Sequence, residues 1–137
     1  MAFLGVAFAL HWFLPVWKGF KWSYPILGAA ISICGFAIMM WGWWLFQKRN
    51  IAICPTAHTG KLIFDGPYRF SRNPMYLGIV MIFLGVAVFM GTPPFFLGAA
   101  IYFVILNSVF IPFEEQKLVS AFGSEYLEYK RRVRRWL

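Results

Sequence analysis

The sequence is poor in charged residues, and in acidic residues above all. Only 13% of its 137 residues are charged, and five acidic residues stand against 13 basic ones. Soluble domains contain about 25% charged residues and are about half apolar, whereas this chain is 61% hydrophobic and 21% aromatic. The composition therefore excludes an ordinary soluble domain and indicates a small protein that buries its apolar surface in lipid.

Metal-ligating and nucleophilic side chains are scarce as well. The two cysteines, Cys34 and Cys54, have neither the spacing of a metal site nor a histidine partner nearby. We therefore interpret both as free thiols and predict no metal site. His11 lies inside an apolar run, where a histidine more often bonds to a neighbouring helix than binds a ligand.

Long apolar runs predict an all-α, integral-membrane fold. The sequence predicts one domain over residues 1–137 with four transmembrane helices, over residues 2–17, 24–46, 75–90 and 95–113. The first run lacks a basic n-region and a cleavage site, so we interpret it as a retained span. The joint at residues 91–94, Gly-Thr-Pro-Pro, predicts an antiparallel hairpin. Glycines along the third span, Gly78 and Gly85 among them, predict close helix packing.

The end of the chain has a different pattern. Apolar and aromatic residues recur at steps of three and four, at Leu118, Phe122, Tyr126, Tyr129, Val133 and Trp136. This stripe predicts a C-terminal amphipathic interfacial helix within residues 114–137. Gly123 predicts a break into two short helices, with Ser124 capping the second and with Glu125 and Glu128 in its first turn.

Basic residues predict the orientation in the membrane. The loop over residues 47–73 holds five Lys and Arg residues, the tail holds six, and the first hairpin holds only Lys18 and Lys21. Because cytoplasmic segments are enriched in these residues, we expect a multi-pass protein with the loop and both termini in the cytoplasm, and the inner membrane as its location if it is bacterial. Basic residues beside apolar spans favour the membrane over nucleic acid as the partner.

The polar run from Asp65 to Gly78 is the most distinctive stretch. Asn73-Pro74 is a strong helix start, because Asn is a favoured N-cap and Pro a favoured first helical residue. Arg72 and the free N–H groups of such a start suit a carboxylate or a phosphate. A capped membrane helix anchored by arginines at the head groups is the alternative, and the residues alone leave both interpretations open.

An acidic pair, Glu114-Glu115, follows the fourth predicted span directly. Acidic residues at a helix C-terminus oppose its dipole, and an acid inside the membrane costs about 2.5–3.5 kcal/mol. These costs favour a functional pair over a solvated helix end. The predicted topology places the pair and the Asn73-Pro74 helix start at one membrane face, where they would form a single polar site.

Two motifs resemble one enzyme superfamily. Gly66-Pro67-Tyr68, followed by the run from Arg72 to Gly78, resembles the signature of the isoprenylcysteine carboxyl methyltransferase and phospholipid methyltransferase superfamily, whose members are integral-membrane enzymes that use S-adenosylmethionine. The tail resembles it through Glu114-Glu115, Leu118, Phe122-Gly123, Glu125-Tyr126, Tyr129 and Val133. Together the motifs cover roughly residues 60–133.

The resemblance implies a cofactor site for S-adenosylmethionine at Gly60, Lys61, Leu62, Ile63, Tyr68, Asn73, Pro74, Met75, Tyr76 and Glu114. Arg72 and Glu115 are candidates for positioning the acceptor. Arg72 also suits the carboxylate of the cofactor, Glu114 its ammonium or ribose, and the two tyrosines its adenine or sulfonium. Methyl transfer from a sulfonium needs positioning and a dry site but no covalent nucleophile.

Two positions depart from the superfamily's pattern. Its motif commonly reads Arg-His-Pro, whereas Asn73 cannot titrate, and an arginine that holds the substrate carboxylate in prenylcysteine enzymes is replaced by Phe110. Carboxyl methylation of a prenylated cysteine is therefore not supported. We predict methyl transfer to a lipophilic small molecule or lipid at the cytoplasmic face. The alternatives are N-methylation of a phospholipid ethanolamine head group and a non-enzymatic transporter subunit or scaffold.

Overall fold

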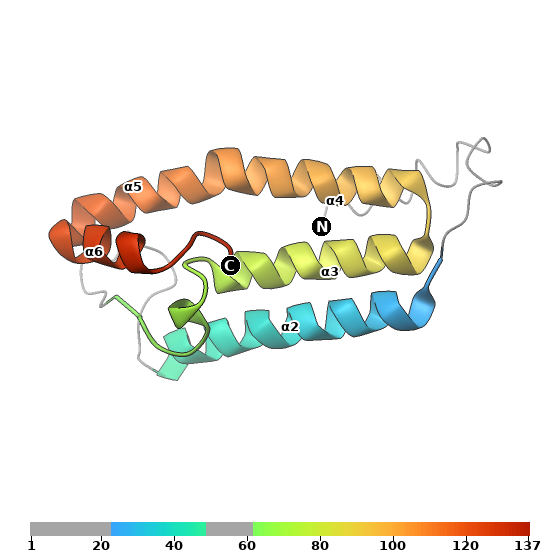
Figure 1. Ribbon diagram of the computed structural model, residues 1–137, viewed down its shortest axis with the longest axis horizontal. Coiled ribbons are helices and arrows are strands. Elements are labelled where there is room, and N and C mark those ends of the chain that lie inside the picture. Colours follow the sequence, from blue (N-terminus) through green and yellow to red (C-terminus); the bar gives the residue numbers. More distant parts are fainter. Residues whose placement is uncertain (1–22, 49–61) are drawn as a thin grey trace. The chain divides into compact units, whose positions relative to one another are not determined.

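A computed structural model describes residues 23–48 and 62–137, and Figure 1 draws them in colour. The regular structure within these ranges is helical, without strands, which confirms the all-α prediction. Its helices are α2 (Pro25–Lys48), α3 (Pro74–Met90), α4 (Pro93–Ile105), α5 (Ile111–Phe122) and α6 (Ser124–Arg132), with a 3₁₀ turn at Gly66–Arg69 and a π-helical turn at Leu106–Phe110.

Within residues 23–48 and 62–137, two stretches are long and apolar enough to cross a membrane. They are Pro25–Lys48 and the continuous run Pro93–Phe122. Most of their apolar side chains point outward, as Ile26 (87% exposed) illustrates, and a helix that is apolar on its outer face needs lipid to cover it. Helix α3 has 17 residues. The predicted number of four spans stays a prediction, and its first span, residues 2–17, lies outside the described residues.

The chain divides into two compact units, which we describe one at a time. The first unit contains Gly78–Ile105 and the described part of Met1–Phe36, and the second contains Leu106–Leu137 and the described part of Ala37–Leu77. The predicted single domain stays a prediction, because two compact units can belong to one domain.

In the first unit, α2 and α3 are antiparallel and approach closely at glycines. A Cβ atom at Gly85 would lie 2.2 Å from Ser32 Oγ, and one at Gly28 would lie 2.5 Å from the backbone nitrogen of Phe89. The Ser32 hydroxyl lies 2.9 Å from the Gly28 carbonyl oxygen, to which it donates. Small residues at such contacts let membrane helices pack backbone against backbone, so the predicted role of Gly85 is confirmed.

The hairpin of α3 and α4 turns at Gly91, whose φ of 63° is one that glycine adopts without strain. Ala87, Phe95 and Ala99 form its buried core. The Phe83 and Tyr102 rings stack with their centroids 4.4 Å apart. The predicted antiparallel hairpin is therefore confirmed.

The second unit holds the 3₁₀ turn, the start of α3, and α5 and α6. Leu45, Ile63 and Tyr68 form its buried cluster. Gly66, with φ of 58°, lies against the Trp41 indole, where a Cβ atom would be 3.3 Å from Nε1. The turn is thus seated on the end of α2, and this fixes where the chain enters α3.

The helix does not stop at residue 113, where the fourth span is predicted to end, and that end of the span stays a prediction. The helical run continues through the π-helical turn into α5, so Glu114 and Glu115 lie inside a helix rather than after one. Pro112 lacks an N–H, and its ring clashes with the carbonyl four residues earlier in a regular α-helix. The wider turn at Leu106–Phe110 lies directly before it, and such turns relieve a conflict of this kind.

The predicted break at Gly123 is confirmed, and two details of it are wrong. Helices α5 and α6 are separate helices (Figure 1), and α5 ends at Phe122. Gly123, between them, has a φ of 53°. Gly123 is the N-cap of α6 and makes no side-chain cap bond, while Ser124 is the first helical residue. Glu125 lies in the first turn, but Glu128 lies beyond it and pairs with Arg132.

The predicted amphipathic stripe belongs to the second unit, and two of its members are buried. Tyr126 and Tyr129 are buried there, and the Tyr129 hydroxyl donates to the Tyr68 carbonyl oxygen over 2.7 Å. The Phe64 and Tyr129 rings meet edge to face, with their centroids 5.0 Å apart. Part of the stripe therefore packs against the 3₁₀ turn, while the predicted interfacial placement of the tail stays a prediction.

Candidate functional site

The start of α3 is held by the last residues of the chain. We name residues 133–137, which follow α6, the C-terminal strap. The Arg72 N–H donates to the Arg134 carbonyl over 3.0 Å. The Ser71 hydroxyl and the Asn73 amide nitrogen both donate to the Arg135 carbonyl, over 3.2 and 3.1 Å. These three bonds fix the backbone where it enters the helix.

Asn73 occupies the predicted N-cap position. Its carbonyl accepts the Leu77 N–H over 2.9 Å, and Pro74 is the first residue of α3. Its own N–H donates to the Ser71 hydroxyl oxygen over 3.1 Å. The Asn73 side chain thus fastens the helix start to the strap, a contact that the sequence alone did not indicate.

The Tyr76 hydroxyl donates to Glu114 Oε1 over 2.7 Å. Tyr76 lies in the first turn of α3 and Glu114 in the first turn of α5. This contact confirms the prediction that the start of α3 and the acidic pair meet. A short bond from a hydroxyl to a carboxylate is charge-assisted, so it orients both side chains.

Glu115 is the centre of a buried ion cluster. Its Oε1 lies 3.1 Å from Arg72 Nη1 and its Oε2 lies 2.9 Å from Lys130 Nζ. Arg135 grips the same carboxylate with two nitrogens, Nε on Oε1 and Nη2 on Oε2, both over 3.2 Å. The Glu115 side chain is only 6% exposed and that of Arg72 only 8%. Three cations on one carboxylate leave the cluster with two positive charges in excess.

The strap also reaches the π-helical turn. Arg135 Nη1 lies 3.4 Å from the Asn107 carbonyl oxygen and 3.3 Å from Asn107 Oδ1. The Trp136 indole donates to the same Oδ1 over 3.1 Å. Since a π-helical turn leaves backbone groups outside the regular α-helical ladder, these donors stabilise it. Arg135 thus ties the acidic pair, the turn and the strap together.

Tyr68 closes the site on the side of the 3₁₀ turn. It is buried, and its ring meets Phe46 at 72° with the centroids 5.7 Å apart. Burial raises the pKa of the Tyr68 hydroxyl above its ordinary value, with further contributions from Tyr129 and from the Glu114 charge. Burial likewise raises the pKa of Tyr129. Both phenols therefore stay neutral across the physiological range.

The predicted site residues have different surroundings. Tyr68, Asn73, Tyr76 and Glu114 all belong to the second unit. The other predicted cofactor residues are placed as follows: Leu62 and Met75 are half-buried, Ile63 and Pro74 are buried, and Gly60 and Lys61 lie outside the described residues. Among the described residues, no group of three metal-ligating side chains occurs.

Sequence reasoning missed Asn107, Lys130 and the strap as parts of the site. Asn107 was detectable in principle, because a polar residue inside an apolar run is costly in a membrane and has a structural or functional reason. Lys130 belongs to a basic run that gave no sign of which member turns inward. The strap contributes mainly carbonyl oxygens, which leave no pattern in the sequence.

Apolar helices that lead into a buried cluster of Tyr, Arg and Glu side chains indicate a membrane protein with a candidate polar site. The comparisons identify its family. The chain belongs to the phospholipid methyltransferase family, whose model matches residues 24–125. The predicted superfamily and the prediction of a methyltransferase are thereby confirmed.

Curated relatives agree with the family. An uncharacterized protein from Haemophilus influenzae is 41% identical over 63 residues, which make up 46% of this chain and 100% of that protein. Protein-S-isoprenylcysteine O-methyltransferase B from Arabidopsis thaliana is 34% identical, over 53% of this chain and 37% of the enzyme. Methanethiol S-methyltransferase 1 from Bradyrhizobium diazoefficiens is 33% identical, over 48% of this chain and 22% of the enzyme. The aligned part thus spans well under half of either named enzyme.

Proposed function

We propose that this protein transfers a methyl group from S-adenosylmethionine to a lipophilic acceptor at the cytoplasmic face of a membrane that it crosses several times. The observation that carries the proposal is the 2.7 Å contact between Tyr76 and Glu114. It joins residues 38 positions apart in the sequence, and both positions are ones that the family resemblance assigns to the cofactor.

The residues around this contact fit the cofactor. Glu114 presents a carboxylate, already oriented by Tyr76, to an ammonium or to ribose hydroxyls. Within the described residues, the buried Arg72 Nε has no hydrogen-bond acceptor, so a donor is available for a carboxylate. Tyr68 supplies a neutral aromatic ring beside a sulfonium or adenine.

The protein's part in such a reaction is to bind, orient and exclude water. Bound S-adenosylmethionine supplies a methyl group on a positively charged sulfur. Glu114 and Tyr76 hold the donor in place, and the buried Tyr68 keeps water out. Phe110 lies half-exposed one helical turn before Glu114 and offers an apolar surface to an acceptor. The acceptor therefore enters from the lipid in this proposal.

The first experiment measures cofactor binding by titration calorimetry on the full chain in nanodiscs, using S-adenosylhomocysteine as a stable probe. We expect Tyr76→Phe and Glu114→Gln each to weaken binding about tenfold, which corresponds to roughly 1.4 kcal/mol. Tyr102→Phe is the matched control, because Tyr102 belongs to the first unit and stacks on Phe83. Unchanged binding in both site variants would remove this site.

The second experiment identifies the acceptor. Membranes that contain the protein receive methyl-labelled cofactor, and their lipids are separated and examined by mass spectrometry. The family's name and the absence of an arginine at Phe110 favour an ethanolamine head group as the second candidate. Labelled N-methyl phospholipid would support that candidate, and a labelled ester, ether or thioether would support another lipophilic acceptor.

A further inference from the structure

A cavity of about 570 Å³ opens beside α5 in the second unit. The lining residues on α5 recur at steps of three and four and so share one face of the helix: Pro112, Glu115, Gln116, Val119 and Ser120. Lys130 from α6 and Arg135 from the strap complete the lining. Tyr76 and Glu114 do not line this cavity, so it is distinct from the proposed cofactor site.

The polar edge of the cavity is positively charged. Glu115 reaches it, but both of its oxygens already accept hydrogen bonds, Oε1 from Arg135 and Oε2 from Lys130 and Arg135, and Oε1 is also ion-paired with Arg72. The carboxylate therefore has little capacity left to bind a ligand cation. Of the three cations in the cluster, Lys130 and Arg135 line the cavity, and their side chains are 41% and 31% exposed.

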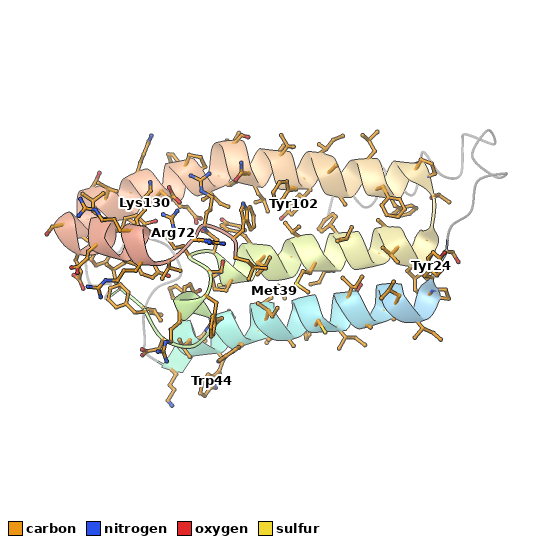
Figure 2. All side chains as sticks on the ribbon, in the orientation of Figure 1. Tyr24, Met39, Trp44, Arg72, Tyr102 and Lys130 are labelled. Carbon is orange, nitrogen blue, oxygen red and sulfur yellow. The ribbon has the colours of Figure 1, made fainter. Side chains whose placement is uncertain are left out.

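Lys130 has hydrogen-bond donors to spare. A lysine ammonium carries three N–H donors, and within the described residues its one hydrogen bond goes to Glu115. Lys130 belongs to α6, and Figure 2 labels it near Arg72, which contacts the same carboxylate. Ser120 on the cavity wall donates to the Gln116 carbonyl, so its hydroxyl oxygen keeps lone pairs but no proton for an anion. Lys130 therefore has N–H donors that an anion in the cavity could use, and Arg135 lines the same cavity.

The wall and the position of the cavity indicate which anion fits. Pro112 and Val119 give it an apolar side, which suits a ligand that carries hydrocarbon beside its charge. Helix α5 ends the stretch Pro93–Phe122, which is long and apolar enough to cross a membrane. Val109, just before the cavity along that stretch, and Phe113, next to the lining residue Pro112, are exposed apolar side chains that need lipid around them. The basic edge of the cavity thus lies next to a lipid-facing apolar surface. A phospholipid has the matching arrangement, with its phosphate next to its acyl chains.

We propose that this cavity binds the phosphate of an anionic phospholipid, with Lys130 as its main contact and Arg135 as the second cation. The proposal does not rest on methyl transfer. It separates one basic residue from the run Lys130–Arg135: Lys130 is directed into the cavity by Glu115, whereas Arg131 is exposed and does not line it.

The test is native mass spectrometry of the full chain in detergent, titrated with phosphatidylglycerol or with phosphatidylcholine of the same acyl chains. We expect the unmodified protein to retain phosphatidylglycerol in preference. Lys130→Gln should lower that retention about five- to tenfold, since one basic residue near an anionic lipid contributes about that factor. Arg131→Gln, which removes the same charge from the next position, should change it less than twofold.

Two further measurements keep the proposal falsifiable. Ser120→Leu fills the cavity without changing charge and should also weaken retention, while thermal melting verifies that each variant is folded. Equal losses in Lys130→Gln and Arg131→Gln would mean diffuse attraction and would overturn the site. Displacement of phosphatidylglycerol by millimolar inorganic phosphate, with no preference between the two lipids, would show a free anion as the ligand and overturn the lipid assignment.

Discussion

Replacing Glu115 by glutamine should lower the stability of the second unit more than replacing any other acidic residue of that unit. The change keeps the shape of the side chain and removes its charge. Arg72, whose side chain is 8% exposed, then keeps a buried charge without its counter-ion. Removing one partner of a buried ion pair costs about 3–5 kcal/mol, because the other charge stays desolvated.

Two matched substitutions set the scale. Glu114→Gln weakens one charge-assisted hydrogen bond, from Tyr76, and should cost about 1.5–3 kcal/mol at most. Glu128→Gln breaks an exposed pair with Arg132, whose side chains are 62% and 74% exposed. Such helical surface pairs contribute about 0.3–0.5 kcal/mol. The expected order of destabilisation is therefore Glu115, then Glu114, then Glu128.

Thermal melting of the purified protein in a mild detergent, followed by tryptophan fluorescence, measures this order. For a chain of this length, about 3–5 kcal/mol corresponds to a fall in melting temperature of roughly 10–20 °C. Glu128→Gln should melt within about 2 °C of the unmodified protein. If Glu115→Gln melted no lower than Glu128→Gln, the ion cluster would not stabilise the fold and the reasoning would be refuted.

Three other predictions concern single contacts. Arg135→Lys should destabilise the second unit by about 1–3 kcal/mol, because a lysine cannot reproduce the two-nitrogen grip on the carboxylate; an unchanged melting temperature would contradict this. Burial raises the pKa of Tyr68 and of Tyr129 in the folded protein. Because the same phenols ionise at lower pH in the unfolded chain, the stability that they contribute is fully present below about pH 10 and is lost as the pH rises further. Melting temperatures measured between pH 8 and 11 should show this decline, and Tyr129→Phe should reduce it. Gly85→Ala would place a Cβ atom 2.2 Å from Ser32 Oγ and should lower the melting temperature by an amount equivalent to about 1–3 kcal/mol; a neutral result would mean that α2 and α3 do not approach as closely as described.

The helices of this protein were largely predictable, and the exception has a physical cause. Unbroken apolar runs set α2 and α3 to within two residues at each end. The helical run that begins at Pro93 continues past the end of its apolar residues for two reasons. A π-helical turn precedes Pro112, and three cations balance the charge of Glu115. Those cations come from distant parts of the chain, so no local window contains the compensation.

The candidate site was predictable where its parts are side chains on neighbouring helices. Helices α3 and α4 are antiparallel, so the chain after α4 returns toward the start of α3, and there Tyr76 contacts Glu114. Arg72 and Glu115 were predicted to position the acceptor, and this role stays a prediction, while their contacts give them a structural role as well. The pairing of Lys130 and Arg135 with Glu115 depends on how α6 folds back after Gly123, which local sequence does not determine.

The C-terminal strap has a consequence for how relatives of this protein are recognised. Its bonds to Ser71, Arg72 and Asn73 use peptide oxygens, which every amino acid possesses. Substitutions in the strap can therefore keep these backbone bonds to the helix start, although a change at Arg135 also alters its side-chain contacts with Glu115. Relatives are then better recognised at this end of the chain by superposing backbone structures than by aligning sequences. The family match ends at residue 125, before the strap begins.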